Sequence, residues 1–252
     1  MTQIIAVLNH KGGVGKSTTA VSLAAALQLS KKNVLAIDMD GQANLTEALG
    51  LSIEEEQTVY GAMCGQYTLP LVKLHNGITV SPSCLDLSAA ELELISEPGR
   101  ELILKGLITK AIAKEHFDYI IIDCGLKQEL LTVNALSASD YCIIPVQSHF
   151  LASEGIPDVL DMVRSVQKHF NPGLKIAGIL LTMYQSRPQL YKSVQQSVRE
   201  IYGDDLHVFD RPIEYTIRIA ECPMAGMSIL DYEPGNPAAE SYRNLASEVL
   251  RL

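Results

Sequence analysis

The sequence predicts one α/β domain in which a mostly parallel sheet is covered by helices on both faces. Several short apolar runs, such as Tyr119–Asp123, lack alternation between polar and apolar residues, which is typical of strands buried on both faces. Segments with helical patterns separate these runs, as crossovers between parallel strands require. The 252 residues show no internal repeat, low-complexity segment or long linker, so we expect residues 1–252 to form a single domain.

The expected elements follow from these patterns in chain order. Apolar runs predict strands at Gln3–Asn9, Asn33–Asp38, Gly77–Pro82, Tyr119–Asp123, Tyr141–Val146 and Lys175–Thr182. Helical patterns predict helices at Lys16–Leu29, Leu85–Ile95, Arg100–His116, Leu151–Phe170, Gln189–Tyr202 and Pro237–Leu252. Because the carboxyl ends of parallel strands meet at one edge of the sheet, we expect a ligand site at that edge.

The charge composition limits what the chain binds through its overall field. Lys and Arg number 20 against 29 Asp and Glu, a formal charge of −9, so any binding to DNA or anionic lipid requires a local basic patch. The five cysteines are odd in number, widely spaced and form no C-x-x-C pair, which indicates reduced thiols of a cytoplasmic protein. No apolar stretch approaches the roughly 20 residues of a membrane span, and we expect none.

A glycine-rich segment joins the first predicted strand to the first predicted helix. Glycines let the backbone fold tightly so that N–H groups point at phosphates, and the helix start adds about half a positive charge. In this pattern Lys16 contacts the β- and γ-phosphates, and Ser17 supplies a hydroxyl to Mg²⁺. The segment predicts a P-loop NTPase that binds and hydrolyses ATP with Mg²⁺, and its residues are Lys11, Gly12, Gly13, Val14, Gly15, Lys16, Ser17 and Thr18.

Three carboxylates follow two of the predicted strands. Asp38 and Asp40 are two residues apart, so their side chains point to one side if the strand continues, and Asp123 ends the isoleucine-rich run. Carboxylates at this edge can hold Mg²⁺ or its water, or orient an attacking water. The alternatives are that Asp38 or Asp40 caps a helix starting near Asn44, and that Asp123 is a plain residue at a strand end.

The early Lys11, with His10 in place of the first glycine of the general P-loop pattern, resembles the deviant P-loop of the ParA/MinD family, and within it the ParA (Soj) partitioning proteins. The likeness extends from Ile4 to Leu250. It implies an ATP-sandwich homodimer in which Lys11 reaches the partner's nucleotide. It also implies that Asp40 positions the hydrolytic water, so that the catalytic residues are Lys11, Lys16 and Asp40, and that the metal site consists of Ser17, Asp38 and Asp123.

Other segments carry the resemblance further, and one departs from it. The family places the base near residues that match Thr182, Met183 and Pro212. After Asp123 the family usually reads D-C-P-P-S, whereas this chain reads Asp123-Cys124-Gly125-Leu126-Lys127. This change alters the loop near the γ-phosphate, so slow or lost hydrolysis remains open while nucleotide binding does not depend on it.

A basic patch is expected in the C-terminal half. Residues 175–199 contain no Asp or Glu, and Lys192 and Arg199, seven residues apart, share one helix face. By resemblance, Arg187 and Arg218 match DNA-contacting arginines, so the predicted phosphate contacts are Arg187, Lys192, Arg199 and Arg218. The alternative is a solvated helix face with scattered cations.

Together these observations favour an ATP-controlled switch for chromosome or plasmid partitioning. The resemblance implies ATP-dependent binding to non-specific DNA at the nucleoid and hydrolysis stimulated by a ParB-type partner. A MinD-like membrane-surface or positioning ATPase is the first alternative, although Ala238–Leu252 lacks the basic face of a membrane helix. The others are an ATP-dependent ligase, amidase or tyrosine kinase, and an iron–sulfur reductase using Cys84 and Cys124.

Overall fold

A seven-stranded sheet forms the middle of the protein in this computed structural model, which describes residues 1–252 except 53–56, 127–128, 149–154, 186–195 and 204. The spatial order is β3-β4-β2-β5-β1-β6-β7, and all neighbours are parallel except β3 and β4. The six predicted strands are confirmed, and the short antiparallel β3 was not predicted. The strands are β1 Gln3–Val7, β2 Val34–Met39, β3 Val72–Lys73, β4 Thr79–Ser81, β5 Tyr119–Cys124, β6 Tyr141–Gln147 and β7 Lys175–Thr182.

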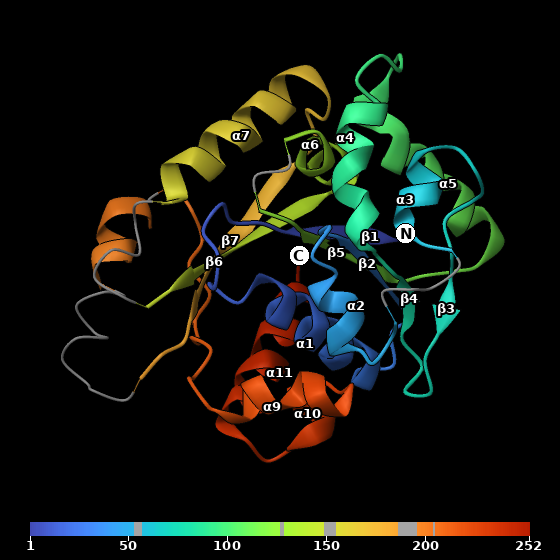
Figure 1. Ribbon diagram of the computed structural model, residues 1–252. Helices are drawn as coiled ribbons and strands as arrows, with labels where there is room; N and C mark the ends of the chain where they lie inside the picture. Colours follow the sequence, from blue (N-terminus) through green and yellow to red (C-terminus); the bar gives the residue numbers. More distant parts are fainter. Residues whose placement is uncertain (53–56, 127–128, 149–154, 186–195, 204) are drawn as a thin grey trace.

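Helices cover both faces of the sheet, as predicted (Figure 1). One face carries α3 (Val59–Met63), α4 (Ala90–Glu93), α5 (Ile103–Lys114), α6 (Glu129–Ala138) and α7 (Ile156–His169). The other face carries α1 (Lys16–Leu29), α2 (Asn44–Ala48), α9 (Arg218–Ala225), α10 (Ile229–Tyr232) and α11 (Pro237–Val249). Two 3₁₀ turns, η1 (Leu85–Ala89) and η2 (Arg100–Leu102), precede α4 and α5.

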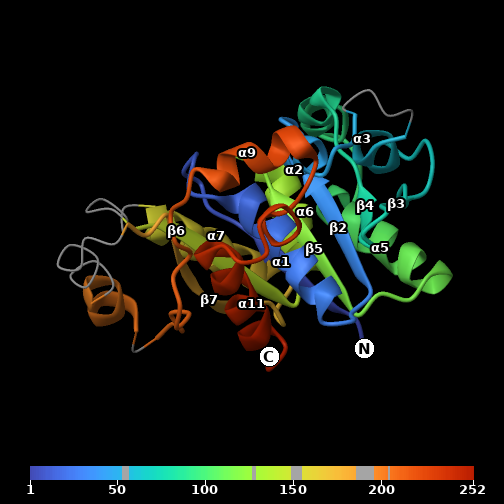
Figure 2. The ribbon, with the colours of Figure 1, turned by 90° about the horizontal axis from the view of Figure 1, so that it is seen from below.

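The C-terminal helix α11 packs on the outside of α1, which therefore lies between α11 and the sheet (Figure 2). This position explains why α1 is rich in Ala and Leu: it is buried on nearly every side. The buried face of α11 includes Tyr242, whose hydroxyl lies 3.4 Å from that of Thr19 in α1. The C-terminal segment thus belongs to the core.

Several predicted helices differ from those observed. The helix predicted over Leu85–Ile95 is observed as the 3₁₀ turn η1 followed directly by the single α turn of α4, with Leu87, Ala90 and Leu94 buried. The helix predicted over Arg100–His116 starts only at Ile103, after η2. The first part of the helix predicted over Gln189–Tyr202 lies outside the described residues. The described part, residues 196–202, is helical.

Strand register brings the polar strand ends together. β5 lies between β1 and β2, and Asp123 is the register partner of both Val7 and Asp38. At the β7 edge of the sheet, the segment after residue 207 runs beside β7. There the Ile213 N–H donates to the Leu181 carbonyl at 2.8 Å. The carboxyl edge of the sheet thus collects the segments for which site residues are predicted.

Candidate functional site

The loop between β1 and α1 has the conformation that its glycines allow. Gly13 and Gly15 have φ angles of 72° and 87°, in the left-handed region that favours glycine. Asn9 holds the loop: its side chain accepts the Lys11 N–H at 2.9 Å and donates to the Pro145 carbonyl at 2.7 Å. The loop therefore has a fixed shape before any ligand binds.

Thr182 at the end of β7 supports the same loop from the other side. Its hydroxyl donates to the Val14 carbonyl at 2.8 Å. The stem of Lys11 lies against α7, since a Cβ built on Gly155 would be 3.2 Å from the Lys11 Cγ. Both residues were predicted to bind nucleotide, and both lie at the loop.

Lys16, the first residue of α1, is a buried cation. Its ammonium donates to the Lys11 carbonyl at 3.2 Å. Burial lowers the pKa of Lys16, while the nearby carboxylates of Asp123 and Asp40 act in the opposite direction. A desolvated ammonium at a helix start, beside the loop N–H groups, is suited to bind an anion.

Asp123 is the clearest sign that something is bound here. The residue is fully buried, and neither oxygen of its carboxylate has a partner at hydrogen-bonding geometry, although the Ser17 hydroxyl is near enough to lower its pKa. Burial is the largest effect and raises this pKa well above its ordinary value, and the neighbouring Asp38 raises it further. An orphaned carboxylate beside a hydroxyl offers the oxygen ligands that Mg²⁺ prefers. The residues present therefore fit a magnesium ion bound with a phosphate ligand.

Asp38 has a different environment although it lies next to Asp123. Its carboxylate accepts hydrogen bonds from the Thr46 hydroxyl at 2.7 Å, the Thr46 N–H at 2.9 Å and the Asp40 N–H at 3.1 Å. Burial raises the pKa of Asp38 to about 6, against the opposing effect of these bonds. Asp38 thus anchors α2 to the end of β2, as the helix-capping alternative anticipates. Its assignment to Mg²⁺ stays a prediction.

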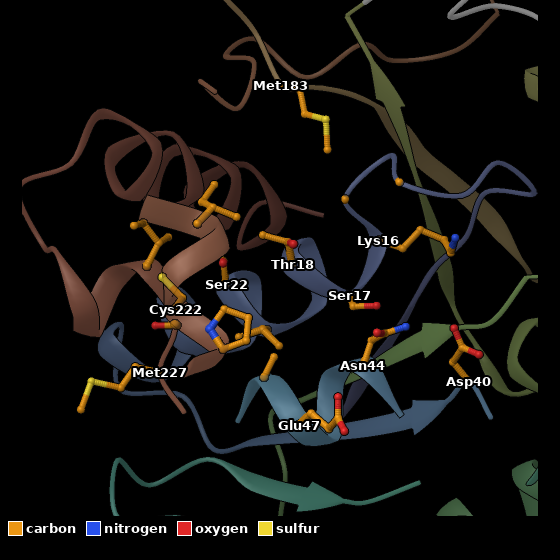
Figure 3. A pocket seen from close by; sticks show the side chains of 18 of the residues that line it. Lys16, Ser17, Thr18, Ser22, Asp40, Asn44, Glu47, Met183, Cys222 and Met227 are labelled. Carbon is orange, nitrogen blue, oxygen red and sulfur yellow. The ribbon is translucent and has the colours of Figure 1, made fainter. Parts of the chain in front are cut away.

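Asp40 lines the pocket beside Lys16. One of its carboxylate oxygens accepts the Gln42 N–H at 3.0 Å, and its own carbonyl accepts the Ser83 hydroxyl at 2.7 Å. The residue is 6% exposed and faces the pocket (Figure 3). A carboxylate fixed in this way can orient a water molecule.

Lys16, Ser17 and Asp40 border a pocket of about 390 Å³ (Figure 3), whereas the fully buried Asp38 and Asp123 are not among its lining residues. A second, more apolar cavity of about 290 Å³ adjoins it. Met183, whose backbone has an unusual φ of 55°, borders both cavities, and Thr182 borders the second. Pro212 borders neither, although the next residue, Ile213, borders the second. The predicted residues that line the first pocket are Gly13, Gly15, Lys16, Ser17, Thr18, Asp40 and Met183.

One wall of the pocket was missed by sequence reasoning. It consists of α9, α10 and part of α2, and Figure 3 shows Cys222 and Met227 from the C-terminal segment and Asn44 and Glu47 from α2. No local motif indicates this wall, because it forms only when the C-terminal segment packs across α1. Its lining residues are Ile219, Cys222, Pro223, Met227, Ser228 and Ile229 from the C-terminal segment, and Asn44, Glu47 and Ala48 from α2.

Of the predicted DNA-binding residues, the structure describes Arg199 and Arg218, and neither lines the phosphate pocket. Arg218 is half-exposed, and its guanidinium contacts Glu221 at 2.8 Å and Glu233 at 3.4 Å. Arg199 lies 4.0 Å from Asp210. Arg187 and Lys192 fall outside the described residues. The two arginines that are described are therefore paired with carboxylates.

Two further features of the described residues bear on the predicted ligands and on the membrane alternative. No group of three or more His, Cys, Asp or Glu side chains in them could hold a metal on its own, so Mg²⁺ at Ser17 and Asp123 needs ligands from a phosphate or water. No helix in the described ranges is long and apolar enough to cross a membrane.

The chain is similar over nearly its whole length to known chromosome-partitioning proteins. A family model described as "AAA domain" matches residues 2–176. The chain is 41% identical over 253 residues to the sporulation initiation inhibitor protein Soj of Bacillus subtilis, covering 99% of this chain and 98% of that protein. It is 36% identical to the chromosome-partitioning ATPase Soj of Treponema pallidum, with 99% and 98% covered.

Among solved structures, cobyrinic acid a,c-diamide synthase from Mycobacterium smegmatis with bound ATP analogue and magnesium has the same fold. The TM-score is 0.88 at 34% identity, and the match covers 100% of this chain and 95% of that one. The similarity to these two Soj proteins and to the solved synthase covers 99–100% of this chain, whereas the family model matches residues 2–176.

Proposed function

Because the chain belongs to the Soj/ParA family of P-loop ATPases, we propose that it is a Mg²⁺-dependent ATPase that acts as a nucleotide-controlled switch in DNA partitioning. One observation carries the catalytic part. A buried ammonium, Lys16, and a buried carboxylate without partners, Asp123, lie beside one rigid glycine loop. The solved relative at 34% identity holds an ATP analogue and magnesium, which supports the same ligands for this site.

The proposed chemistry is attack of water on the terminal phosphate. Lys16 binds the β- and γ-phosphates and neutralises charge that develops on them. Asp40 accepts a hydrogen bond from the attacking water and orients it. A bound Mg²⁺ supplies further charge neutralisation, and Ser17 and Asp123 are the residues to hold it. In an ATP-sandwich homodimer, Lys11 adds a second positive charge from the partner subunit.

Phosphate release measures this function directly. We expect wild type to release phosphate slowly from ATP with Mg²⁺ and not with EDTA. Asp40→Ala should bind ATP yet release phosphate at least about 10-fold more slowly, since positioned acid–base groups contribute about 10²–10⁴ in rate. Wild-type protein that binds ATP without any turnover would overturn the ATPase and leave a nucleotide-binding switch.

The DNA part of the proposal depends on the arginines of the C-terminal half. Two subunits brought together by ATP would double the cations presented to a duplex. With roughly four phosphate contacts per subunit, from Arg187, Lys192, Arg199 and Arg218, the logarithmic salt slope would be about −3 to −4 per subunit. A ParB-type protein would then stimulate hydrolysis and release, and the protein would act in the cytoplasm at the nucleoid.

Binding to a non-specific duplex tests this part. Wild type and an Arg187→Glu/Arg218→Glu variant would be compared at low and high salt with ATP, ADP or no nucleotide. Binding that needs ATP and is lost with salt and in the variant would support the proposal. Equal binding in all nucleotide states, or none in any, would contradict a DNA switch.

A synthase is the second candidate, because the solved relative at 34% identity is named cobyrinic acid a,c-diamide synthase. An enzyme of that kind couples ATP use to a second substrate. Turnover of ATP by the protein alone, increased by DNA and a ParB-type protein, would favour the partitioning switch. Turnover that requires an added carboxylic acid and an amine donor would favour the synthase.

The structure also bears on the membrane-surface alternative. Tyr242, Leu245 and Val249 of α11 are buried in the core, with α1 as a main packing partner. An amphipathic helix that binds lipid needs these apolar side chains at its surface. The partitioning switch therefore agrees better with the position of α11.

A further inference from the structure

The start of α6 is capped by a side chain from a distant part of the chain. The first N–H groups of a helix have no partner within the helix. Here one carboxylate oxygen of Glu91, in α4, accepts the N–H of Leu130 at 2.8 Å and of Leu131 at 3.3 Å. A negative charge at a helix start is also favoured by the helix dipole. Glu91 thus fixes the first turn of α6.

The first turn of α6 is close in sequence to the phosphate pocket. Leu126 lines that pocket together with Lys16 and Asp40, and α6 begins three residues later. Leu126 also lies against the P-loop, because a Cβ built on Gly12 would be 3.4 Å from its Cδ1. Three residue steps span at most roughly 11 Å, so the place where α6 begins restricts where Leu126 can lie.

A second contact holds the body of α6 independently of Glu91. Asn134 is fully buried, donates to the Arg100 carbonyl at 2.8 Å and accepts the Leu104 N–H at 3.0 Å at the start of α5. Removal of Glu91 would therefore release the first turn of α6 while the rest of the helix stays in place. The consequence is expected at the pocket as well as in the modest loss of stability, about 0.5–2 kcal/mol, that removal of a helix cap causes.

We propose that Glu91 is a positioning residue for the nucleotide site: by capping α6 it holds Leu126 and the end of β5 at the place where the terminal phosphate of a nucleoside triphosphate binds. This inference rests on the proposed ATP site. It makes discrimination between triphosphate and diphosphate depend on α4, since a diphosphate would be bound mainly by the loop Gly13–Thr18, whereas the hydrogen bonds of Glu91 go to α6. It also connects α4, which exposes Leu92, to the pocket through the first turn of α6.

Three variants of the full-length protein separate this role from general stabilisation. Glu91→Ala removes the cap, and Glu91→Gln keeps an oxygen that accepts the same two N–H groups. Glu93→Ala is the matched control, because Glu93 has the same charge on the same helix but contacts Tyr60 at 2.8 Å and Cys64 at 3.2 Å instead of α6. The measurements are affinity for ADP and for a non-hydrolysable ATP analogue, phosphate release from ATP, and amide hydrogen exchange at Leu130 and Leu131.

We expect Glu91→Ala to weaken binding of the ATP analogue about 5- to 10-fold and ADP less than about 2-fold, with faster exchange at both amides, as loss of one charged cap predicts. Phosphate release should fall by a similar factor. Glu91→Gln should recover most of the loss, and Glu93→Ala should behave as wild type. Equal weakening of both nucleotides with a lower Tm, or no change in either, would overturn the proposal. If the proposed ATP site itself were wrong, the wild type would bind neither nucleotide, which distinguishes that outcome from failure of the Glu91 proposal. Amide exchange at Leu130 and Leu131 would still report on the cap.

Discussion

The phosphate end of the pocket and the wall made by α9 and α10 are built in different ways. At the phosphate end, charges are buried: Lys16 and Asp123 lie at the ends of core elements, and their neighbours come from adjacent strands. At the wall, charge is exposed: Arg218 is half-exposed and paired with Glu221 and Glu233. Buried charges without protein partners indicate a ligand, whereas surface ion pairs contribute little and can exchange partners.

This difference explains why the two regions support different parts of the proposed function. The phosphate end is fixed by strand register and loop hydrogen bonds, so its ligand is restricted in shape and charge. The wall is held by tertiary packing of the C-terminal segment, and its arginine can bind DNA only by leaving its carboxylates.

The largest effect is expected at Lys16. Lys16→Ala should weaken Mg–ATP binding on the order of 1,000-fold, or about 4 kcal/mol, because charge-assisted bonds to two phosphates are lost at a buried position. Isothermal titration calorimetry would measure this. Lys105→Ala, which removes an exposed lysine on α5, should have no effect. A loss under 10-fold in Lys16→Ala would mean that the buried cation does not bind phosphate.

Gly226 tests how the wall is held. It has a φ of 62°, and a Cβ built on it would lie 2.9 Å from the Cα of Gly50, after α2. Gly226→Ala should cost about 2 kcal/mol or more in the free energy of unfolding, from backbone strain and displacement of Gly50. Gly65→Ala, with a φ of 77° and open space, should cost less. Gly235→Ala, which has neither feature, should cost least, and equal Tm values for the three variants would contradict this account.

Asp123 tests the phosphate end through pH. The folded pKa is raised, so the stability due to the neutral carboxyl is fully present below the ordinary value of 3.8 and is lost as pH rises through the folded pKa. Without nucleotide, Asp123→Asn should therefore gain over wild type with rising pH, by about 1–2 kcal/mol at pH 8. Thermal unfolding between pH 4 and 8 would measure this, with Asp86→Asn, an exposed carboxyl, as the control. A variant that is less stable than wild type at pH 8 would contradict an unpartnered carboxylate.

The smallest effect is expected at the carboxylates around Arg218. A Glu221→Gln/Glu233→Gln variant should bind DNA about 3- to 10-fold more tightly with ATP, and its salt slope should steepen by up to about one, because one guanidinium becomes available to phosphate. Glu115→Gln/Glu200→Gln changes the net charge by the same amount at other exposed carboxylates and is the control. If both double variants gained equally, net charge rather than Arg218 would account for the change.

The signals that predict the phosphate end are local in the sequence. The glycine pattern, Lys16 and the strand-end carboxylates each lie within a few residues of the element that places them. The sequence could not predict that Asp38 bonds to Thr46 while Asp123 has no partner, since that depends on strand register and on α2. The sequence likewise could not predict the ion pair between Arg218 and Glu233, because Glu233 lies beyond the turn between α9 and α10.

The sequence could not predict the pocket wall or the α6 cap, because both depend on contacts between distant segments of the chain. The residues of α9 that line the pocket become neighbours of α2 only after α11 and α10 pack on α1. The short helices α2, α3 and α10 are 4 or 5 residues long, too short for a helical period to identify them. The sequence predicts that Glu91 lies in a helix. No residue pattern near Glu91 indicates its contact with Leu130 of α6, 39 residues away.

The most direct test of the central claim is the effect of Mg²⁺ on ADP affinity in wild type and in Asp123→Asn. If the buried carboxylate is the magnesium side of a nucleotide site, Mg²⁺ should strengthen ADP binding to wild type at least about 10-fold, as one charge-assisted interaction would. The same addition should have little effect on Asp123→Asn. An equal gain with Mg²⁺ in both proteins would contradict the account, because the unpartnered carboxylate would then take no part in binding the metal and its nucleotide.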